Sequence, residues 1–236
     1  MKVKKITETI KKFTDGEITE DEAIEELKKA EPFDFYAAVS HLYLHQGYRL
    51  EKGGLPSVSK LFRKVYDDNL NKAVKELEKD HPIRILATDH LRFERLLETL
   101  ENISEEIKEE SKTNRTDEIR TAVDALSLLN VHIEDEERLV FPAWRQSKRW
   151  DNMISYLLED EHKDIVDAYE RLRKKSKDAK QNWTKKDWKT ISELIDELSG
   201  IIHFHTFHEE DIFYPIIVNQ LPNAEYDKIK EKMKNR

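Results

Sequence analysis

An eleven-residue pattern occurs twice in this chain, and it restricts which folds the chain can adopt. The copies begin at His132 and at His205 and align without a gap, each with His, then Glu four and five positions later, then an aromatic residue followed by Pro. On an α-helix, side chains at positions i and i+4 point the same way, one turn apart. Each copy therefore presents an imidazole and a carboxylate on one helical face. Two such helices predict a metal site inside a helical bundle.

Four long segments carry apolar residues at helical spacing, and each has a histidine inside its apolar stripe. The segments are approximately 82–111, 116–144, 150–179 and 184–220. Steps of three and four between the apolar residues mean that these stripes, and their histidines, point inward. With short connections, the segments predict an all-α fold, an up-down-up-down four-helix bundle. Only 5 Gly and 6 Pro occur, too few for the frequent turns of an all-β fold.

The inward faces also carry groups that an apolar core does not accept without compensation. Glu136 and Glu209 lie on two of the stripes, and a buried carboxylate is strongly destabilising unless it is neutralised or bound. The same stripes contain no Lys or Arg. A bound cation is then the simplest compensation. Because the chain has no Cys, the ligands have to be His, Asp and Glu.

Six inward-facing residues form the predicted ligand set. They are His90, His132, Glu136, His162, His205 and Glu209. Four imidazoles and two carboxylates exceed what one tetrahedral zinc ion uses. The set therefore favours two metal ions bridged by carboxylates.

This pattern resembles the hemerythrin-like HHE cation-binding family over about residues 77–220. The motifs that carry the resemblance are Asp89-His90, His132 to Glu137 with Phe141-Pro142, Glu161-His162, and His205 to Glu209 with Tyr214-Pro215. The resemblance implies a di-iron centre, with two iron ions per chain and the two glutamates as bridges. The set of four His and two Glu looks closer to the di-iron proteins of iron-centre repair and nitrosative stress than to the oxygen carriers.

The chain departs from the oxygen-carrying members of that family on its third and fourth helices. Those proteins have a second His one turn after the first on the third helix, where this chain has Val166. Their last helix ends the ligand set with Asp at the fifth position after its His, where this chain offers Glu210, with Glu209 one position earlier. The apolar residue predicts an open metal position beside His162, and hence reaction with a small oxidant instead of reversible oxygen carriage. The repair proteins usually carry an N-terminal cysteine-containing domain, which this chain lacks.

Some neighbours of the predicted ligands remain alternatives. Glu94, His208 and Glu210 each lie near a predicted ligand on the same helix, and their spacing favours a flanking position over direct ligation. Glu137 is predicted to be a charge on the helix face. Glu159, less than a turn before His162, either relays protons or is merely exposed.

Residues 1–76 are predicted to form a helical module before the metal-binding domain at 77–236. Thr19 and Glu22 have the spacing of a capping box, which predicts a helix start. Further helices are predicted after Pro32 and near 57–77. His41 and His45 share the i, i+4 spacing but lack a carboxylate partner, so they are predicted to be ordinary surface or interhelical residues. A protein partner of this module is an open alternative.

Charge and hydropathy argue against two classes of partner, nucleic acids and membranes. The net charge of −8 argues against nucleic acid, because binding phosphates calls for a basic surface. No apolar run approaches the ~20 residues of a membrane span, and the first residues have no signal-peptide core. A cytoplasmic protein with no membrane partner is therefore expected.

The leading functional prediction is a non-haem di-iron protein whose metal meets a small gaseous or peroxide ligand (oxygen, nitric oxide or peroxide) for sensing, scavenging or iron handling. Two alternatives stay open. One is a redox enzyme or iron-centre repair factor, which requires turnover with a reductant. The other is a helical interaction protein with a structural metal. Fold alone does not choose among them, because four-helix bundles host all three.

Overall fold

The computed structural model describes residues 3–30, 34–35, 38, 42, 61, 64–65, 74–147, 153–177 and 183–234. These residues are helical apart from short connections, and none of them is in a β-strand. The chain divides into two compact units, residues 1–77 with 207–220 and residues 78–206 with 221–236. Most of the helix predicted after Pro32, much of the one near 57–77, and both His41 and His45 lie outside the described residues.

The N-terminal residues form two helices, α1 (Val3–Thr14) and α2 (Glu20–Leu27). The predicted capping box is confirmed: the Thr19 side chain accepts a hydrogen bond from the backbone N–H of Glu22, and the Glu22 carboxylate accepts one from the backbone of Thr19. Gly16 lies in the connection with φ at 75°, a left-handed conformation that glycine adopts without steric strain. The helices pack together through their buried apolar residues Ile6, Ile10, Ala23 and Leu27.

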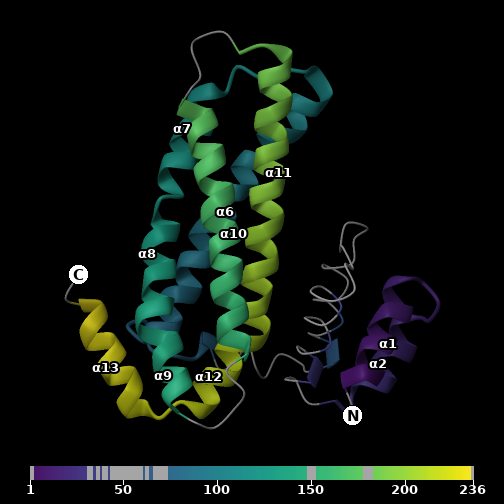
Figure 1. Cartoon of the computed structure of the whole chain (residues 1–236), viewed down its shortest axis with the longest axis vertical. Coiled ribbons are helices and arrows are strands. Elements are labelled where there is room, and N and C mark those ends of the chain that lie inside the picture. Colours follow the sequence, from purple (N-terminus) through teal and green to yellow (C-terminus); the bar gives the residue numbers. More distant parts are fainter. Residues whose placement is uncertain are drawn as a thin grey trace. The chain divides into compact units, whose positions relative to one another are not determined.

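Four long helical segments lie side by side in the bundle (Figure 1). They are α6 (Pro82–Glu110), α7 with α8 (Thr116–Ala125 and Leu128–Asp135), α10 (Met153–Lys177) and α11 (Lys185–His208). Ser104 of α6 lies 2.8 Å from Ser192 of α11, joined by their hydroxyls, and Arg171 of α10 pairs with Glu197 of α11 at 2.7 Å. Because α7 packs on both α6 and α10, these contacts close a ring. The predicted all-α four-helix bundle is confirmed.

Two of these segments continue beyond their α-helices. The second one passes from α8 into a π-helical turn, η1 (Glu136–Val140), and then α9 (Phe141–Gln146). The fourth passes from α11 into a second π-helical turn, η2 (Glu209–Phe213), and then α12 (Tyr214–Gln220). A last helix, α13 (Asn223–Lys234), packs on α6 and η1. Both π-helical turns therefore begin at a predicted glutamate ligand.

The helix predicted over 116–144 is not continuous, and this expectation was wrong. A turn at Leu126 and Ser127 separates α7 from α8. There the backbone N–H groups of Ser127, Leu129 and Asn130 bond to the carbonyls three residues earlier, at 3.0–3.2 Å. This tighter hydrogen-bonding pattern replaces the α-helical one over less than two turns. Neither Gly nor Pro occurs in this stretch, so the sequence carries no strong signal for the interruption.

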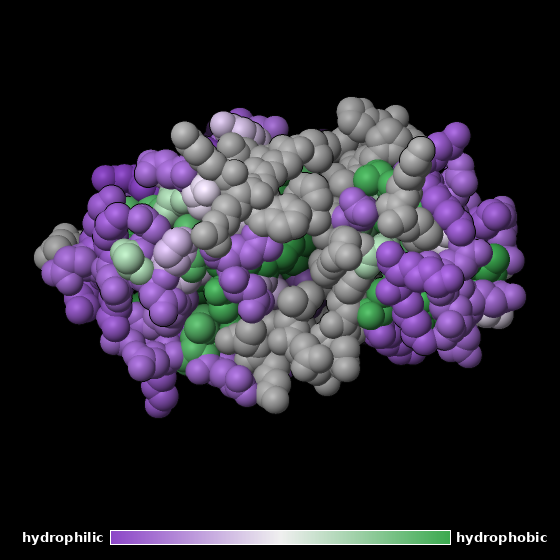
Figure 2. All heavy atoms as spheres, turned by 90° about the horizontal axis from the view of Figure 1, so that it is seen from below, coloured by the Kyte–Doolittle hydropathy of each residue, from purple (hydrophilic) through white to green (hydrophobic). Residues whose placement is uncertain are grey.

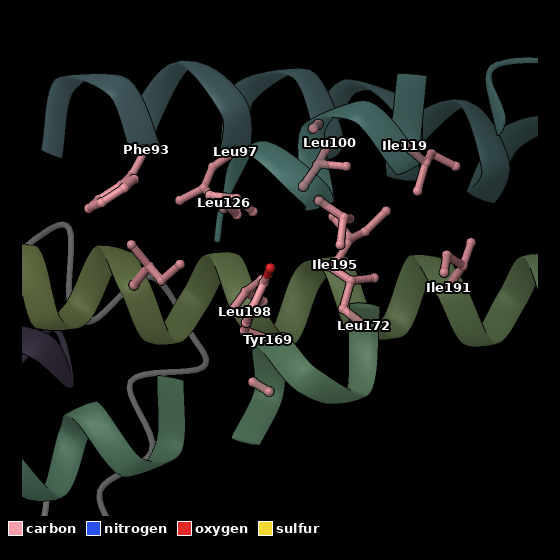
Figure 3. Packing of buried hydrophobic residues seen from close by; sticks show 14 of the residues in the cluster. Phe93, Leu97, Leu100, Ile119, Leu126, Tyr169, Leu172, Ile191, Ile195 and Leu198 are labelled. Atoms are coloured by element: carbon pink, nitrogen blue, oxygen red, sulfur yellow. The ribbon is translucent and has the colours of Figure 1, made fainter. Parts of the chain in front are cut away.

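One hydrophobic core fills the bundle between its four segments. Figure 3 shows Leu97 and Leu100 of α6 on the side that faces Ile195 and Leu198 of α11. Tyr169 is also buried in this core. Val166 is partly buried against the same core. The core therefore holds the helices in the register that brings the histidines together.

Hydrophilic side chains cover most of the described surface in view in Figure 2, as the charged fraction of 38% predicts. Among the described helices, none combines the length and the apolar character that a membrane crossing requires.

Candidate metal centre

Four histidines meet inside the bundle as two pairs. Nε2 of His90 lies 3.0 Å from Nε2 of His132, and Nε2 of His162 lies 3.2 Å from Nε2 of His205. All four side chains are buried. Two nitrogen ligands at about 2.1 Å from one ion, at right angles to each other, stand about 3.0 Å apart. Each pair therefore has the spacing of two neighbouring ligands of one metal ion.

Glu136 lies between the two histidine pairs. Its Oε2 atom is 3.3 Å from Nε2 of His132 and 3.3 Å from Nε2 of His162. The carboxylate is fully buried, and the ligand atoms of Glu136, His162 and His205 lie within 4.8 Å of one another. One carboxylate thus contacts a histidine of each pair.

Glu209 follows His205 by one turn on a helical segment that runs without a break from α11 through η2 into α12. It is fully buried. The Tyr214 hydroxyl donates a hydrogen bond of 3.3 Å to its Oε2. Helix geometry thus places this carboxylate and the imidazole of His205 on one face.

The π-helical turns follow from the prolines of the repeated pattern. Pro142 has no N–H to offer the carbonyl four residues earlier, and its ring crowds that carbonyl. The chain widens instead, so that the N–H of Phe141 bonds to the carbonyl of Glu136, five residues back. Tyr214, which precedes Pro215, bonds to the carbonyl of Glu209 in the same way. Each copy of the pattern thus builds a wide turn that starts at its glutamate.

Replacing Pro142 by alanine is expected to weaken metal binding without unfolding the protein. The new N–H and the smaller side chain allow the turn to relax toward an α-helix, which reorients Glu136 relative to His162. We expect the affinity for a divalent metal to fall about tenfold or more, while the metal-free protein melts at the same temperature or higher. Metal titration and thermal unfolding measure the two effects.

The exposed Pro222 lies between α12 and α13, outside both wide turns, and provides the control. Pro222→Ala should leave the metal affinity unchanged. If Pro142→Ala binds metal as tightly as the unmodified protein, the wide turn does not orient the glutamate.

Two of the histidines contact a carboxylate through Nδ1, the ring nitrogen that does not take part in the contact within the pair. The Nδ1 atom of His162 lies 2.9 Å from Oε1 of Glu137, and Nδ1 of His205 lies 3.0 Å from Oε2 of Glu161. A proton on Nδ1 that is donated to the carboxylate leaves Nε2 as the metal-binding atom. The interpretation of Glu137 as a charge on the helix face was therefore wrong, because its carboxylate contacts a predicted ligand.

Asp89 occupies the corresponding place behind His132, with 4.0 Å between its Oδ2 and Nδ1 of the ring. Asp89 and Glu161 each directly precede a predicted ligand and face the histidine of the next segment. The motifs Asp89-His90 and Glu161-His162 did not by themselves predict a role for their acids. The recurrence of an acid directly before the histidine was the signal that could have identified them.

The electrostatics of the site follow from these contacts. Burial lowers the pKa of the His162 imidazole, but hydrogen bonds to Glu136 and Glu137 outweigh that effect and leave the pKa above its ordinary value. The hydrogen bond from His162 in turn lowers the pKa of Glu137. His162 and Glu137 therefore stabilise each other's charged forms.

The other candidate residues lie in different surroundings. Glu94 is exposed, which agrees with the prediction that it does not ligate. His208 is fully buried, and Glu210 is half-buried. Glu159 is half-buried and forms an ion pair of 2.6 Å with Arg145, so it is not merely exposed.

The donor set is compatible with a transition metal. Imidazole nitrogens and carboxylate oxygens suit iron, zinc and related ions. A bound cation offsets the negative charge of the buried Glu136 carboxylate. It also gives the two Nε2 atoms of each histidine pair a shared ion to bind in place of their close contact with each other. The residues therefore fit a metal centre.

Comparison with known proteins adds one finding. The family model of the hemerythrin HHE cation-binding domain matches the chain over residues 81–152 and 153–235. The first matched segment contains His90, His132 and Glu136, and the second contains the other three predicted ligands. No curated protein and no solved structure matched the chain.

Proposed function

Because this chain belongs to the hemerythrin HHE cation-binding family, we propose that it is a non-haem di-iron protein whose centre binds or reacts with a small gaseous or peroxide ligand. Binding a metal cation is the property that the family description states. The choice of iron, the number of ions and the reaction with a small oxidant are the proposed parts. The observation that carries the proposal is the pairing of the four histidines around one shared carboxylate.

The paired histidines support two ion positions. His90 and His132 would hold one ion, and His162 with His205 the other. Glu136 contacts a histidine of each pair and serves as one bridge. Glu209, one turn after His205 and fully buried, is proposed as the second bridge. Bound iron would supply a redox-active Lewis acid at this place.

Two features favour a small ligand over a large substrate. Two histidines and two shared carboxylates supply about four donors per ion, fewer than the six of an octahedral ion, and Val166 adds no donor one turn after His162. The ring of Phe141 stacks on His162 at 5.6 Å between centroids, and the ring of Phe93 meets His132 edge-on at 5.4 Å. These aromatic rings fix the imidazoles and limit the space around them.

Metal analysis together with a visible absorption spectrum tests this function on protein purified without added metal. We expect about two iron ions per chain. After reduction, the protein should lose its reduced spectrum in air and should not regain it when the gas is removed. Full recovery would mean that the protein carries oxygen reversibly. Zinc in place of iron, with no response to oxygen or nitric oxide, would favour the structural-metal alternative.

A chain that begins at Lys75 is expected to fold and to retain its metal. The reason is that all six predicted ligands lie beyond residue 77, and the division at residue 76 itself stays a prediction. Circular dichroism and metal content measure the outcome. Loss of metal from a shortened but still helical chain would show that segment 207–220, which belongs to the same compact unit as residues 1–77, depends on those residues to present Glu209.

A further inference from the structure

We propose that the C-terminal helix α13 is an acid-sensitive clasp on the bundle, and that protonation of His81 releases it. The contacts that carry this inference join the turn before α6, the helix α13 (yellow in Figure 1) and the π-helical turn η1. All three belong to one compact unit of the chain. The inference does not depend on which metal the protein binds.

The helix α13 packs on the turn that carries a predicted metal ligand. It contacts both α6 and η1, and Tyr226 and Ile229 are its buried side chains. The turn η1 begins with Glu136, and the next residue is Glu137, whose carboxylate contacts His162. Release of α13 therefore removes a packing partner of the segment that presents both carboxylates.

His81 joins α6 to α13 in its neutral form. It is the N-cap residue of α6, and its Nδ1 atom accepts a hydrogen bond of 3.3 Å from the backbone N–H of Ile83. Its ring also packs on the ring of Tyr226 in α13, with 4.3 Å between the centroids. A protonated imidazole carries a hydrogen on each nitrogen and accepts no hydrogen bond. Protonation therefore breaks the cap at the residue that α13 packs against.

The surroundings of His81 oppose its protonation. Burial has the largest effect and lowers the pKa of the imidazole, and the charge of Lys230 on α13 lowers it further, against smaller opposite effects of Asp80 and Glu78. The helix dipole acts in the same direction as Lys230, because a cation at the N-terminus of α6 is unfavourable. Tyr226 stays neutral, since burial raises its pKa. The docked helix therefore favours the neutral histidine.

An ion pair holds α13 at the same place and keeps its charges in mild acid. Lys230 of α13 pairs with Asp80 in the turn before α6. The hydrogen bond between them lowers the pKa of Asp80 and raises that of Lys230. Histidine, with an ordinary pKa of about 6.5, is the residue type that changes its charge between pH 5 and 8. His81 is therefore the group of this contact that responds to mild acid.

The direction of the response follows from the two states of the helix. While α13 is docked, the pKa of His81 lies below its ordinary value. After release the imidazole returns to about 6.5, so the released state binds the proton more readily. Docking is therefore strongest above about pH 6.5 and weakens as the pH falls below that value. Between pH 7.5 and pH 5.5 the equilibrium shifts toward release by at most about tenfold.

Hydrogen–deuterium exchange of the full-length protein at pH 7.5 and pH 5.5 measures the docking of α13. Correction for the pH dependence of exchange itself leaves the protection that the structure provides. The protection of residues 223–234 should fall by about three- to tenfold at the lower pH. The helix α7, which contains no histidine, should change little. Titration of the His81 ring by NMR should give a pKa below the ordinary value.

Replacing His81 by asparagine is the decisive comparison, because Asn caps a helix without titrating. In His81→Asn, the corrected protection of α13 should be the same at both pH values. Lys230→Gln breaks the pair with Asp80 and should lower the protection of α13 at both. Lys228→Gln changes another charge of the same helix, which pairs with Glu225 within α13, and should leave both values unchanged.

Three outcomes would overturn the inference. The first is equal protection of α13 at both pH values in the unmodified protein. The second is an acid response of His81→Asn as large as that of the unmodified protein, which would assign the response to another group. The third is a pKa of His81 at or above 6.5 in the unmodified protein, a measurement that requires no variant. Failure of the proposed di-iron function would alter none of these readouts, since each reports on α13 or His81 directly.

Discussion

If the proposed two-ion centre is correct, replacing Glu136 by alanine is expected to remove at least one ion from each chain. This carboxylate is fully buried and lies 3.3 Å from a histidine of each pair, so its loss deprives both ion positions of a shared, negatively charged donor. Metal content after purification, and the absorption spectrum of the iron-loaded protein, measure the loss.

Glu134 is the matched control for this substitution. It lies two residues earlier in the same segment, is exposed, and pairs with Arg138 on the outside of the helix. Glu134→Ala removes the same charge and should leave the metal content unchanged. If Glu136→Ala retains two ions, the bridge has been assigned to the wrong residue, and Glu209 would be the only shared carboxylate.

Removal of the metal by a chelator is expected to lower the melting temperature by about 5–10 °C. An ion at about one hundred times its dissociation constant stabilises the folded state by about 2.7 kcal/mol, and each kcal/mol corresponds to about 2–4 °C for a chain of this size. The stabilisation has a local cause, because the ion offsets the burial of the Glu136 carboxylate beside His132 and His162. Thermal unfolding followed by circular dichroism, with metal content measured in parallel, provides the test.

Two comparisons sharpen this measurement. Adding iron back should restore the original melting temperature, which excludes damage by the chelator. The Glu136→Ala protein should respond to the chelator with a smaller shift, because it has less metal to lose. An unchanged melting temperature after verified metal removal would contradict ligation at buried positions.

The helices of the bundle were predictable because their signals are local. Pro82 marks the start of α6, and Thr184 caps α11, where the backbone N–H of Asp187 donates to its hydroxyl at 3.3 Å. Proline at a first helical position and a hydroxyl at an N-cap act through the nearest backbone groups, so no distant residue is needed to interpret them. The turn at Leu126 and Ser127 was missed for the opposite reason, since no Gly or Pro marks it.

The predicted ligands were identifiable for a similar local reason. The spacing of His132 and Glu136 shows that both face one side of a helix, whatever that helix packs against. The same spacing does not show which side chain of another segment contacts the Nδ1 atom of each histidine. The contact between Glu137 and His162 joins two segments, and so does the contact between Glu161 and His205. Contacts between segments depend on helix register and rotation, which periodicity within one helix leaves undetermined.

The sequence by itself determined which residue types face the bundle interior, and therefore that buried carboxylates and imidazoles require a cation there. Only the tertiary structure decided how these residues combine. It pairs His90 with His132 and His162 with His205, and it places Glu136 between the pairs. The physical reason is the distance along the chain over which each interaction acts. Helical periodicity is set by hydrogen bonds between residues a few positions apart. The pairing of the histidines is set by the packing of side chains from four separate segments.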